Sequence, residues 1–227
     1  MNHSNAEPVS IIVNDEHTVS GILLAPARAR ACYLFAHGAG AGMAHPFMDV
    51  VATELGERSI ATFRYQFPFM ERRARRPDPP KLAQATVRAA AAEAARLAPT
   101  LPLVAGGKSF GGPMTSQAQA ASPLPGVRGL VFLGFPLHPA GLPSDERAMH
   151  LFDVQVPMLF LQGARDELAD VKLLQQVTKR LGERASLRVY QDADHSFHVP
   201  ARMRRNDANV RSEMLDALVA WTLSVTS

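Results

Sequence analysis

Residues 101–112 read Leu-Pro-Leu-Val-Ala-Gly-Gly-Lys-Ser-Phe-Gly-Gly, an apolar run that ends in glycines around one serine. Within this stretch, residues 107–111 match the pattern G-x-S-x-G, which marks a serine on a sharp turn between a strand and a helix. Such a turn strains the backbone at the serine, and a side chain at the position two residues before or after the serine would collide with the turn. Glycines stand at both positions, so the stretch predicts a buried strand, then Ser109 on the turn, then a helix.

The same glycines admit a second interpretation, phosphate binding, because Gly107-Lys108-Ser109 resembles the end of a P-loop. A P-loop requires another glycine five residues before Gly107, and the chain has Pro102 there. This mismatch disfavours a phosphate site.

Strand-like apolar runs alternate with helical patterns on both sides of this motif. An opening hairpin is expected at 11–13 and 19–24, and further strands are expected at 31–36, 60–63, 101–105, 130–135, 158–161 and 187–190. Helices are expected at 47–55 with a stop at Gly56, from an Asp78 N-cap with Pro79 at the first helical position to about Leu97, and at 171–181 and 210–221. This alternation predicts one α/β domain over residues 1–227, with a mostly parallel sheet of seven to eight strands and helices on both faces.

In such sheets the chemistry gathers at the carboxyl ends of the strands. The expected strand 31–36 is followed by His37-Gly38-Ala39-Gly40-Ala41-Gly42, whose small residues would let backbone N–H groups point into a site. A dinucleotide-binding fingerprint would need a third glycine at position 43, where the chain has Met43. We expect His37 to shape this loop rather than to transfer protons.

A serine nucleophile needs a base and a carboxylate that orients the base, in the chain order Ser, Asp or Glu, His. His195 follows the last expected strand and is the best-placed base, with His198 as its close competitor; His138 and His150 come too early. Asp166 directly follows the strand at 158–161 and is the best-placed acid. The neighbouring carboxylates are expected to be solvated turn residues; these are Glu167, Asp192 and Asp194.

Taken together, the motifs at 37–40, 107–112, 163–166 and 194–197 resemble the α/β-hydrolase family, and in particular its small, nearly lidless, dienelactone-hydrolase-like bacterial members. The resemblance implies that Ser109 is the nucleophile, His195 the base and Asp166 the orienting acid. It also implies an oxyanion hole formed by the backbone N–H groups of Phe110 and Ala39. The Gly40 N–H is the less favoured candidate for the second donor. Residues 64–68, Arg-Tyr-Gln-Phe-Pro, also resemble a segment of the small members.

Two departures from that family limit what the resemblance implies. Dienelactone hydrolases proper use a cysteine nucleophile, whereas this motif carries Ser109, so their substrate is not carried over. Residues 135–156 are too few for a large cap, so an open site is expected.

Composition excludes several other classes of protein. The net charge is +3, 7% of residues are aromatic, and no zinc-finger or aromatic-basic signature is present, which disfavours nucleic acid as a partner. The N-terminal residues lack a signal-peptide pattern, no apolar run approaches a membrane span, and the lone Cys32 rules out a disulfide framework. A cytoplasmic protein with no membrane partner is therefore expected. Two arginine clusters are expected to be solvated, or else to face an anionic substrate; they are Arg72, Arg73, Arg75 and Arg76, and Arg202, Arg204 and Arg205.

These observations predict a serine hydrolase that cleaves a small soluble acyl ester through an acyl-enzyme and needs no cofactor or metal. A thioesterase or a lactonase with the same three residues is the alternative within this chemistry. A non-catalytic interaction protein that keeps the fold is the alternative from another class. The sequence does not indicate the oligomeric state.

Overall fold

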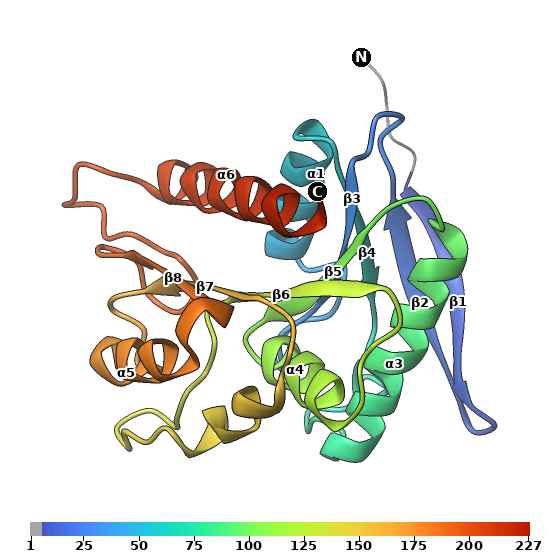
Figure 1. The fold of residues 1–227 in the computed structure, drawn as a ribbon, viewed down its shortest axis with the longest axis horizontal. Helices are drawn as coiled ribbons and strands as arrows, with labels where there is room; N and C mark the ends of the chain where they lie inside the picture. The colour runs from blue at the N-terminus through green and yellow to red at the C-terminus, as the bar shows by residue number, and fades with distance from the viewer. Residues whose placement is uncertain (1–5) are drawn as a thin grey trace.

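The computed structural model describes residues 6–227. The strands in this range form one eight-stranded sheet in the order β1-β2-β4-β3-β5-β6-β7-β8 (Figure 1). The strands are β1 (Ala6–Asn14), β2 (His17–Leu24), β3 (Ala31–Ala36), β4 (Ile60–Tyr65), β5 (Leu103–Lys108), β6 (Val127–Leu133), β7 (Met158–Gly163) and β8 (Ala185–Tyr190). Strand β2 pairs antiparallel with β1 and with β4, and every other neighbouring pair is parallel. The expected hairpin and mostly parallel sheet are confirmed.

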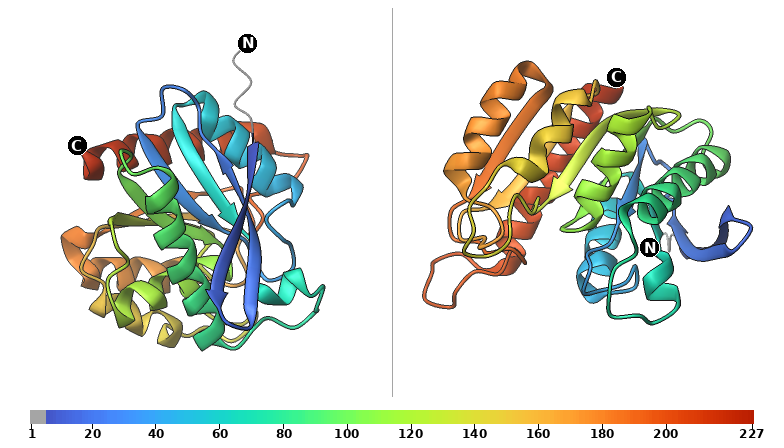
Figure 2. Two further views of the ribbon diagram at one scale, coloured as in Figure 1. Left: turned by 90° about the vertical axis from the view of Figure 1, so that its right-hand side faces the viewer. Right: turned by 90° about the horizontal axis from the view of Figure 1, so that it is seen from below.

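Helices cover both faces of the sheet. They are α1 (Pro46–Glu57), α2 (Pro68–Glu71), α3 (Pro80–Leu97), α4 (Gly111–Ala121), α5 (Val171–Leu181) and α6 (Asp207–Thr226), with 3-10 helices η1 (Glu146–Asp153) and η2 (Gly182–Arg184). Helices α1 and α6 lie on one face, and α3, α4 and α5 lie on the other (Figures 1 and 2). The architecture is that of an α/β protein with helices on both sides, as the alternation of patterns predicts.

Strand β3 shows why the central strands read as unbroken apolar runs. All six of its residues are buried. Tyr33 and Phe35 belong to the core under α1 and α6, whereas Leu34 and Ala36 belong to the core under α3, α4 and α5. Because successive side chains point to opposite faces of a strand, a sheet covered on both faces buries every position.

Two residues predicted to mark helix ends, Asp78 and Gly56, do not mark them. Helix α3 begins at Pro80 with Pro79 at its N-cap, and Asp78 does not cap it. The Asp78 carboxylate instead accepts a hydrogen bond from the Phe69 backbone N–H at 2.8 Å and pairs with Arg72 at 2.7 Å. These contacts satisfy the buried carboxylate away from the helix end.

The second of these residues, Gly56, lies within α1, which runs to Glu57. The turn that follows is made at Ser59, which takes the left-handed conformation with φ 62°. Gly56 therefore does not stop the helix.

None of the described helices is long and apolar enough to cross a membrane.

Candidate active site

Ser109 occupies the sharp turn that the glycine pattern predicts. It follows the last residue of β5 and precedes α4, with φ 49°, a conformation that L-residues other than glycine seldom adopt. A Cβ at Gly107 would lie 2.5 Å from the Ala36 carbonyl oxygen, and one at Gly111 would lie 2.6 Å from the Ala36 Cβ. The two glycines therefore let the turn approach β3, which is the clash relief expected from the sequence.

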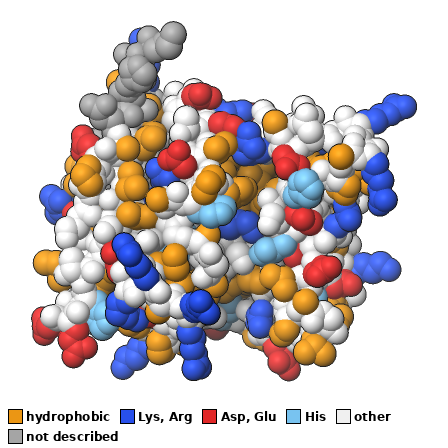
Figure 3. Space-filling model, turned by 180° about the vertical axis from the view of Figure 1, so that it is seen from behind, with side chains coloured by type: hydrophobic (Ala, Val, Ile, Leu, Met, Phe, Trp, Pro, Cys, Tyr) orange, Lys and Arg blue, Asp and Glu red, His pale blue; other side chains and the backbone are white. Residues whose placement is uncertain are grey.

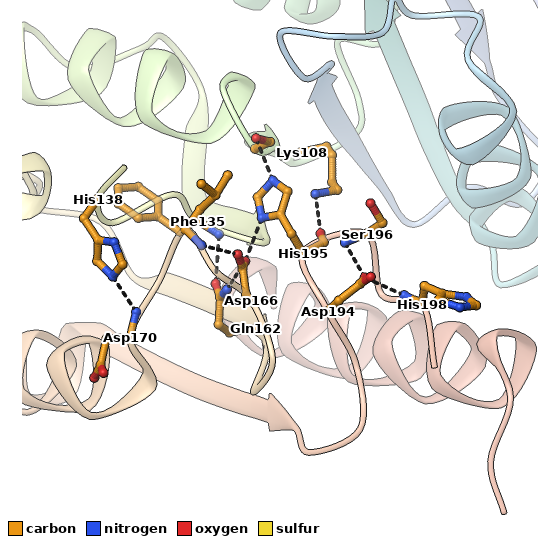
Figure 4. A network of polar contacts seen from close by, with 12 residues as sticks. Lys108, Phe135, His138, Gln162, Asp166, Asp170, Asp194, His195, Ser196 and His198 are labelled. Carbon is orange, nitrogen blue, oxygen red and sulfur yellow. Dashed lines mark hydrogen bonds and ion pairs between the residues drawn. The ribbon is translucent and has the colours of Figure 1, made fainter. Parts of the chain in front are cut away.

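The structure brings Ser109, His195 and Asp166 together at the carboxyl edge of the sheet. Figure 4 shows the contact between His195 and Asp166. His195 Nε2 lies 2.9 Å from Ser109 Oγ, and His195 Nδ1 lies 2.7 Å from Asp166 Oδ2. With the Nδ1 proton donated to the carboxylate, Nε2 is free to accept the serine proton. This is the arrangement of nucleophile, base and orienting acid that acyl transfer needs.

Gln162, which the sequence reasoning missed, holds Asp166 in place. Its side-chain oxygen accepts a hydrogen bond from the Phe135 N–H at 2.9 Å, so its amide nitrogen faces Asp166 Oδ2 at 2.5 Å. Asp166 Oδ1 also accepts from the Leu168 N–H at 2.8 Å. A glutamine at the end of an otherwise apolar strand was the available signal, because a buried amide needs polar partners.

His198, the competing base, lies outside this arrangement. Its side chain is 62% exposed and its Nδ1 lies 3.0 Å from the carboxylate of Asp207, which raises the pKa of His198. Asp194, expected to be a turn residue, accepts hydrogen bonds at Oδ1 from the Ser196 and His198 N–H groups (Figure 4). It therefore shapes the loop that carries His195.

The two histidines excluded by chain order also have other partners. The His138 ring lies between backbone groups, with Nδ1 donating to the Pro139 oxygen and Nε2 accepting from the Asp170 N–H, each at 2.8 Å. The half-buried His150 has its Nε2 2.7 Å from Oγ of the fully buried Ser116, between η1 and α4. Neither ring contacts Ser109.

The loop after β3 passes directly beside Ser109. A Cβ at Gly38 would lie 3.5 Å from the Ser109 Cβ. Within residues 6–227, neither the Ala39 N–H nor the Phe110 N–H donates a hydrogen bond to another protein group. Both donors are thus free for an oxyanion, although their role remains a prediction.

His37 and the segment after β4 fix the shape of this loop. The fully buried His37 ring donates from Nδ1 to the Gly38 oxygen at 2.8 Å and accepts at Nε2 from the Phe67 N–H at 3.0 Å. Burial lowers the pKa of His37 to about 4, so the ring stays neutral and keeps this donor–acceptor pair. His37 therefore shapes the loop, as the sequence reasoning expected.

Met43, at the far end of the loop, is held at both of its backbone polar groups. Its N–H donates to Gln66 Oε1 at 2.8 Å, and its carbonyl oxygen accepts from Arg64 Nη1 at 3.2 Å. Arg64 is buried and also contacts Asp49 at 3.2 Å. This assigns a structural role to residues 64–68, for which the sequence offered only a resemblance.

A cavity of about 350 Å³ opens beside Ser109. Its walls are mainly apolar, with one guanidinium and one amide; besides Ser109 they comprise Phe110, Pro113, Met114, Gln117, Pro136, Arg147 and Leu168. The volume falls in the range of small-molecule sites, which is roughly 300–1,000 Å³. The site can thus receive a small, largely apolar group next to the nucleophile.

The arginine clusters are partly paired with acidic residues. Arg72 pairs with Asp78 and Arg205 with Glu213. On the face drawn in Figure 3, acidic and basic side chains are interspersed, with hydrophobic side chains between them. The cluster residues other than the half-buried Arg205 are exposed, which agrees with solvated surface arginines.

Most of the chain matches a known protein family. The family described as an alpha/beta hydrolase domain matches residues 29–223. The match includes Ser109, Asp166, His195 and the loop after β3.

Solved structures of similar fold cover nearly the whole chain. Dienelactone hydrolase from Anabaena variabilis ATCC 29413 has a TM-score of 0.80 at 22% identity, covering 99% of this chain and 100% of that one. A lidless α/β serine hydrolase from Xanthomonas campestris has a TM-score of 0.72 at 21% identity, over 96% and 95% of the chains. Est1E from Butyrivibrio proteoclasticus has a TM-score of 0.74 at 14% identity, over 95% and 99%. At these identities the likeness shows the shared fold.

Proposed function

The chain belongs to the α/β-hydrolase family, and from this premise we propose that it is a serine hydrolase that cleaves a small ester through an acyl-enzyme. The observation that carries the proposal is the unbroken chain of contacts from Ser109 Oγ through His195 to Asp166, at 2.9 and 2.7 Å. A hydrolase of this family needs an activated nucleophile, and these contacts supply one.

In the acylation step, Ser109 Oγ attacks the ester carbonyl carbon while His195 Nε2 takes the hydroxyl proton. Asp166 stabilises the imidazolium that forms and keeps the Nδ1 proton in place. The carbonyl oxygen, now an oxyanion, would accept hydrogen bonds from the Ala39 and Phe110 N–H groups. His195 then gives its proton to the leaving alcohol as the ester C–O bond breaks.

Deacylation repeats these steps with water as the nucleophile. His195 Nε2 removes a proton from a water molecule, which attacks the acyl carbon, and the oxyanion forms in the same place. Collapse of this intermediate returns the proton to Ser109 Oγ and frees the carboxylic acid. A thioester or a lactone would pass through the same steps, since only the leaving group differs.

The size of the substrate follows from the cavity and from the chain between β6 and β7. The cavity of about 350 Å³ beside Ser109 suits a short acyl group. The segment between these strands spans residues 134–157 and contains the 3-10 helix η1. It is too short for a large cap over the site, so we propose a small ester that dissolves in water.

A fluorophosphonate probe tests the proposal, because it forms a covalent bond with an activated serine. We expect the protein to gain one adduct, located at Ser109 by peptide mass spectrometry, and the Ser109→Ala variant to gain none. Ser116→Ala is the matched control. Ser116 also forms a hydrogen bond with a histidine, but it is fully buried and therefore out of reach of the probe. A non-catalytic protein of this fold would remain unlabelled, and labelling that persists in Ser109→Ala would refute the assignment of the nucleophile.

A further inference from the structure

Lys108, the residue before Ser109, extends its side chain to the backbone of the base. Its ammonium donates to the His195 carbonyl oxygen at 2.6 Å (Figure 4). Within residues 6–227 this ammonium forms no salt bridge, and it donates to no side chain. A backbone carbonyl is therefore the principal partner of a partly buried cation.

The surroundings of Lys108 leave room for a charged group. A Cβ at Gly134, where φ is +69°, would lie 3.2 Å from Lys108 Nζ, so the glycine keeps this space open. The Phe197 ring centroid lies 5.8 Å from Nζ, within the range of a cation–π contact. Burial lowers the pKa of Lys108 to about 8, against the opposing effect of the Asp166 and Asp194 carboxylates, so the group is mainly an ammonium at pH 7.

The loop that carries His195 is anchored on both sides of the base: Ala193, Phe197 and Val199 are buried, and the Val199 N–H donates to Asp207 Oδ1 at 2.8 Å. Lys108 adds an attachment at His195 itself. Residues 191–200 contain no helix or strand. The hydrogen bonds that Asp194 accepts from Ser196 and His198 bend the loop onto itself but do not tie it to the sheet. The Arg165 N–H donates to the Ala193 oxygen at 2.9 Å and holds the start of the loop, two residues before the base.

We propose that Lys108 is a positioning residue that fixes the His195 backbone relative to Ser109 through its hydrogen bond to the His195 carbonyl. The proposal rests on the proposed function, because it assumes that His195 is the base. The nucleophile and the base would then be joined twice, once by Ser109 and the imidazole and once by Lys108 and the backbone of His195. A charge-assisted hydrogen bond of this length suits the task, since such bonds are about twice as strong as neutral ones.

Positioning and charge make opposite predictions for this lysine. A positive charge near His195 disfavours the imidazolium that forms during acylation, so removal of the charge alone would favour that step. Loss of the attachment would let the imidazole move away from Ser109 Oγ, and a misplacement of about 1 Å can cost roughly 100-fold in rate. Lys108 is not among the residues that line the cavity, so substrate binding should be little affected.

The first experiment compares Lys108→Met with Lys179→Met, a matched change at an exposed lysine of α5. We expect Lys108→Met to lower kcat for p-nitrophenyl acetate by about 10- to 100-fold, with KM within about twofold, and to slow fluorophosphonate labelling by a similar factor. Lys179→Met should match the wild type in all three measurements. An unchanged or higher kcat in Lys108→Met would overturn the proposal.

Chemical rescue separates the ammonium from simple packing. The Lys108→Cys variant, alkylated with 2-bromoethylamine, regains an ammonium on a side chain of lysine length, whereas 2-bromoethanol adds a neutral hydroxyl. The native thiol of Cys32 is buried and its pKa is raised to about 12, so it should not react. We expect the amine to restore at least tenfold more of the lost kcat than the alcohol. Equal rescue by both reagents would overturn the proposal.

The labelling measurement distinguishes failure of this proposal from failure of the proposed function. If the wild type is not labelled, the assignment of Ser109 fails and the Lys108 proposal falls with it. If the wild type is labelled at Ser109 and the Lys108→Met variant is labelled at the same rate, only the role of Lys108 is refuted.

Discussion

Gln162 donates from its amide nitrogen to Asp166 Oδ2 at 2.5 Å, and the same carboxylate oxygen faces His195 Nδ1 at 2.7 Å. One oxygen therefore carries both contacts, while Oδ1 accepts from the Leu168 N–H. Because the Phe135 N–H fixes the orientation of the Gln162 amide, the carboxylate cannot rotate without breaking several hydrogen bonds. The position of His195, the proposed base, thus depends on a glutamine at the end of β7.

Changing this glutamine should therefore reduce activity. Gln162→Glu keeps the shape and the acceptor for Phe135 but sets a second carboxyl group against Asp166, and like charges at this distance disfavour ionisation of both. We expect kcat for p-nitrophenyl acetate to fall by about 10- to 100-fold at pH 7. This loss does not exceed the roughly 10²- to 10⁴-fold that a general base contributes to the rate. The exposed Gln155→Glu serves as the control. Wild-type activity in Gln162→Glu would show that the orientation of Asp166 does not depend on this amide.

The two nearby histidines should differ sharply. His195→Ala should lower kcat/KM by at least the roughly 10²- to 10⁴-fold expected for loss of a general base, whereas His198→Ala should cost less than about tenfold. The reason is that His195 joins Ser109 to Asp166, while His198 pairs with Asp207. Steady-state kinetics of both variants on one activated ester decide between them, and a larger loss from His198→Ala would reverse the assignment.

Gln66 should affect kcat by holding the loop that carries Ala39, and not by contact with the substrate. Gln66→Ala removes the acceptor of the Met43 N–H and loosens the loop that carries Ala39. Loss of one oxyanion donor typically costs about 10²- to 10³-fold in kcat, so displacement of that donor should cost about 10- to 100-fold, with KM nearly unchanged. Gln66→Glu retains a side-chain acceptor and should recover much of the loss. A change in KM alone would indicate that the loop binds substrate instead.

Acyl chain length should have an optimum among short chains. Burial of a methylene group is worth about 0.8 kcal/mol, but only where apolar surface encloses it. The cavity of about 350 Å³ beside Ser109 has room for a short acyl chain. We expect kcat/KM to be highest for acetyl to hexanoyl p-nitrophenyl esters and to fall toward palmitoyl, measured below the micelle concentration of each ester. A steady rise to long chains would reveal a further apolar channel.

His37 should make the fold sensitive to acid. Burial lowers its pKa to about 4 in the folded protein, whereas a histidine side chain surrounded by water has a pKa of 6.5. Between these values the unfolded chain binds a proton that the folded state does not, so the free energy of unfolding decreases as the pH falls from 6.5 to 4. The loss from this group should reach about 3 kcal/mol at pH 4.

His37→Gln isolates this effect, because an amide can replace both hydrogen bonds of the neutral ring without titrating. Urea unfolding of the wild type and the variant at pH 7 and 4.5 should show a smaller pH-dependent loss in the variant. His150, whose pKa burial also lowers to about 4, leaves part of the dependence in both proteins. Identical losses would mean that His37 does not contribute.

The sequence predicted what is encoded locally. The glycines around Ser109 mark the turn without reference to the rest of the chain, and the order of motifs placed Asp166 and His195 at the same sheet edge. Gln162, Lys108 and Gln66 could not be assigned because their partners lie 4 to 87 residues away and depend on how loops meet above the sheet. Asp78 misled for the same reason, since its partners are Phe69 in α2 and Arg72 directly after that helix.

The strand order also distributes the proposed active site unequally along the chain. Ser109, Asp166 and His195 all follow residue 100, whereas the loop with Ala39 belongs to the first hundred residues, and the two parts meet where β3 pairs with β5. Division of the chain at the exposed Pro99–Thr100 turn would give one fragment with the proposed nucleophile, Ser109, and another with a proposed oxyanion donor, Ala39. Neither fragment alone would have the complete apparatus, so ester hydrolysis would report reassociation of the two, as in a split-enzyme sensor.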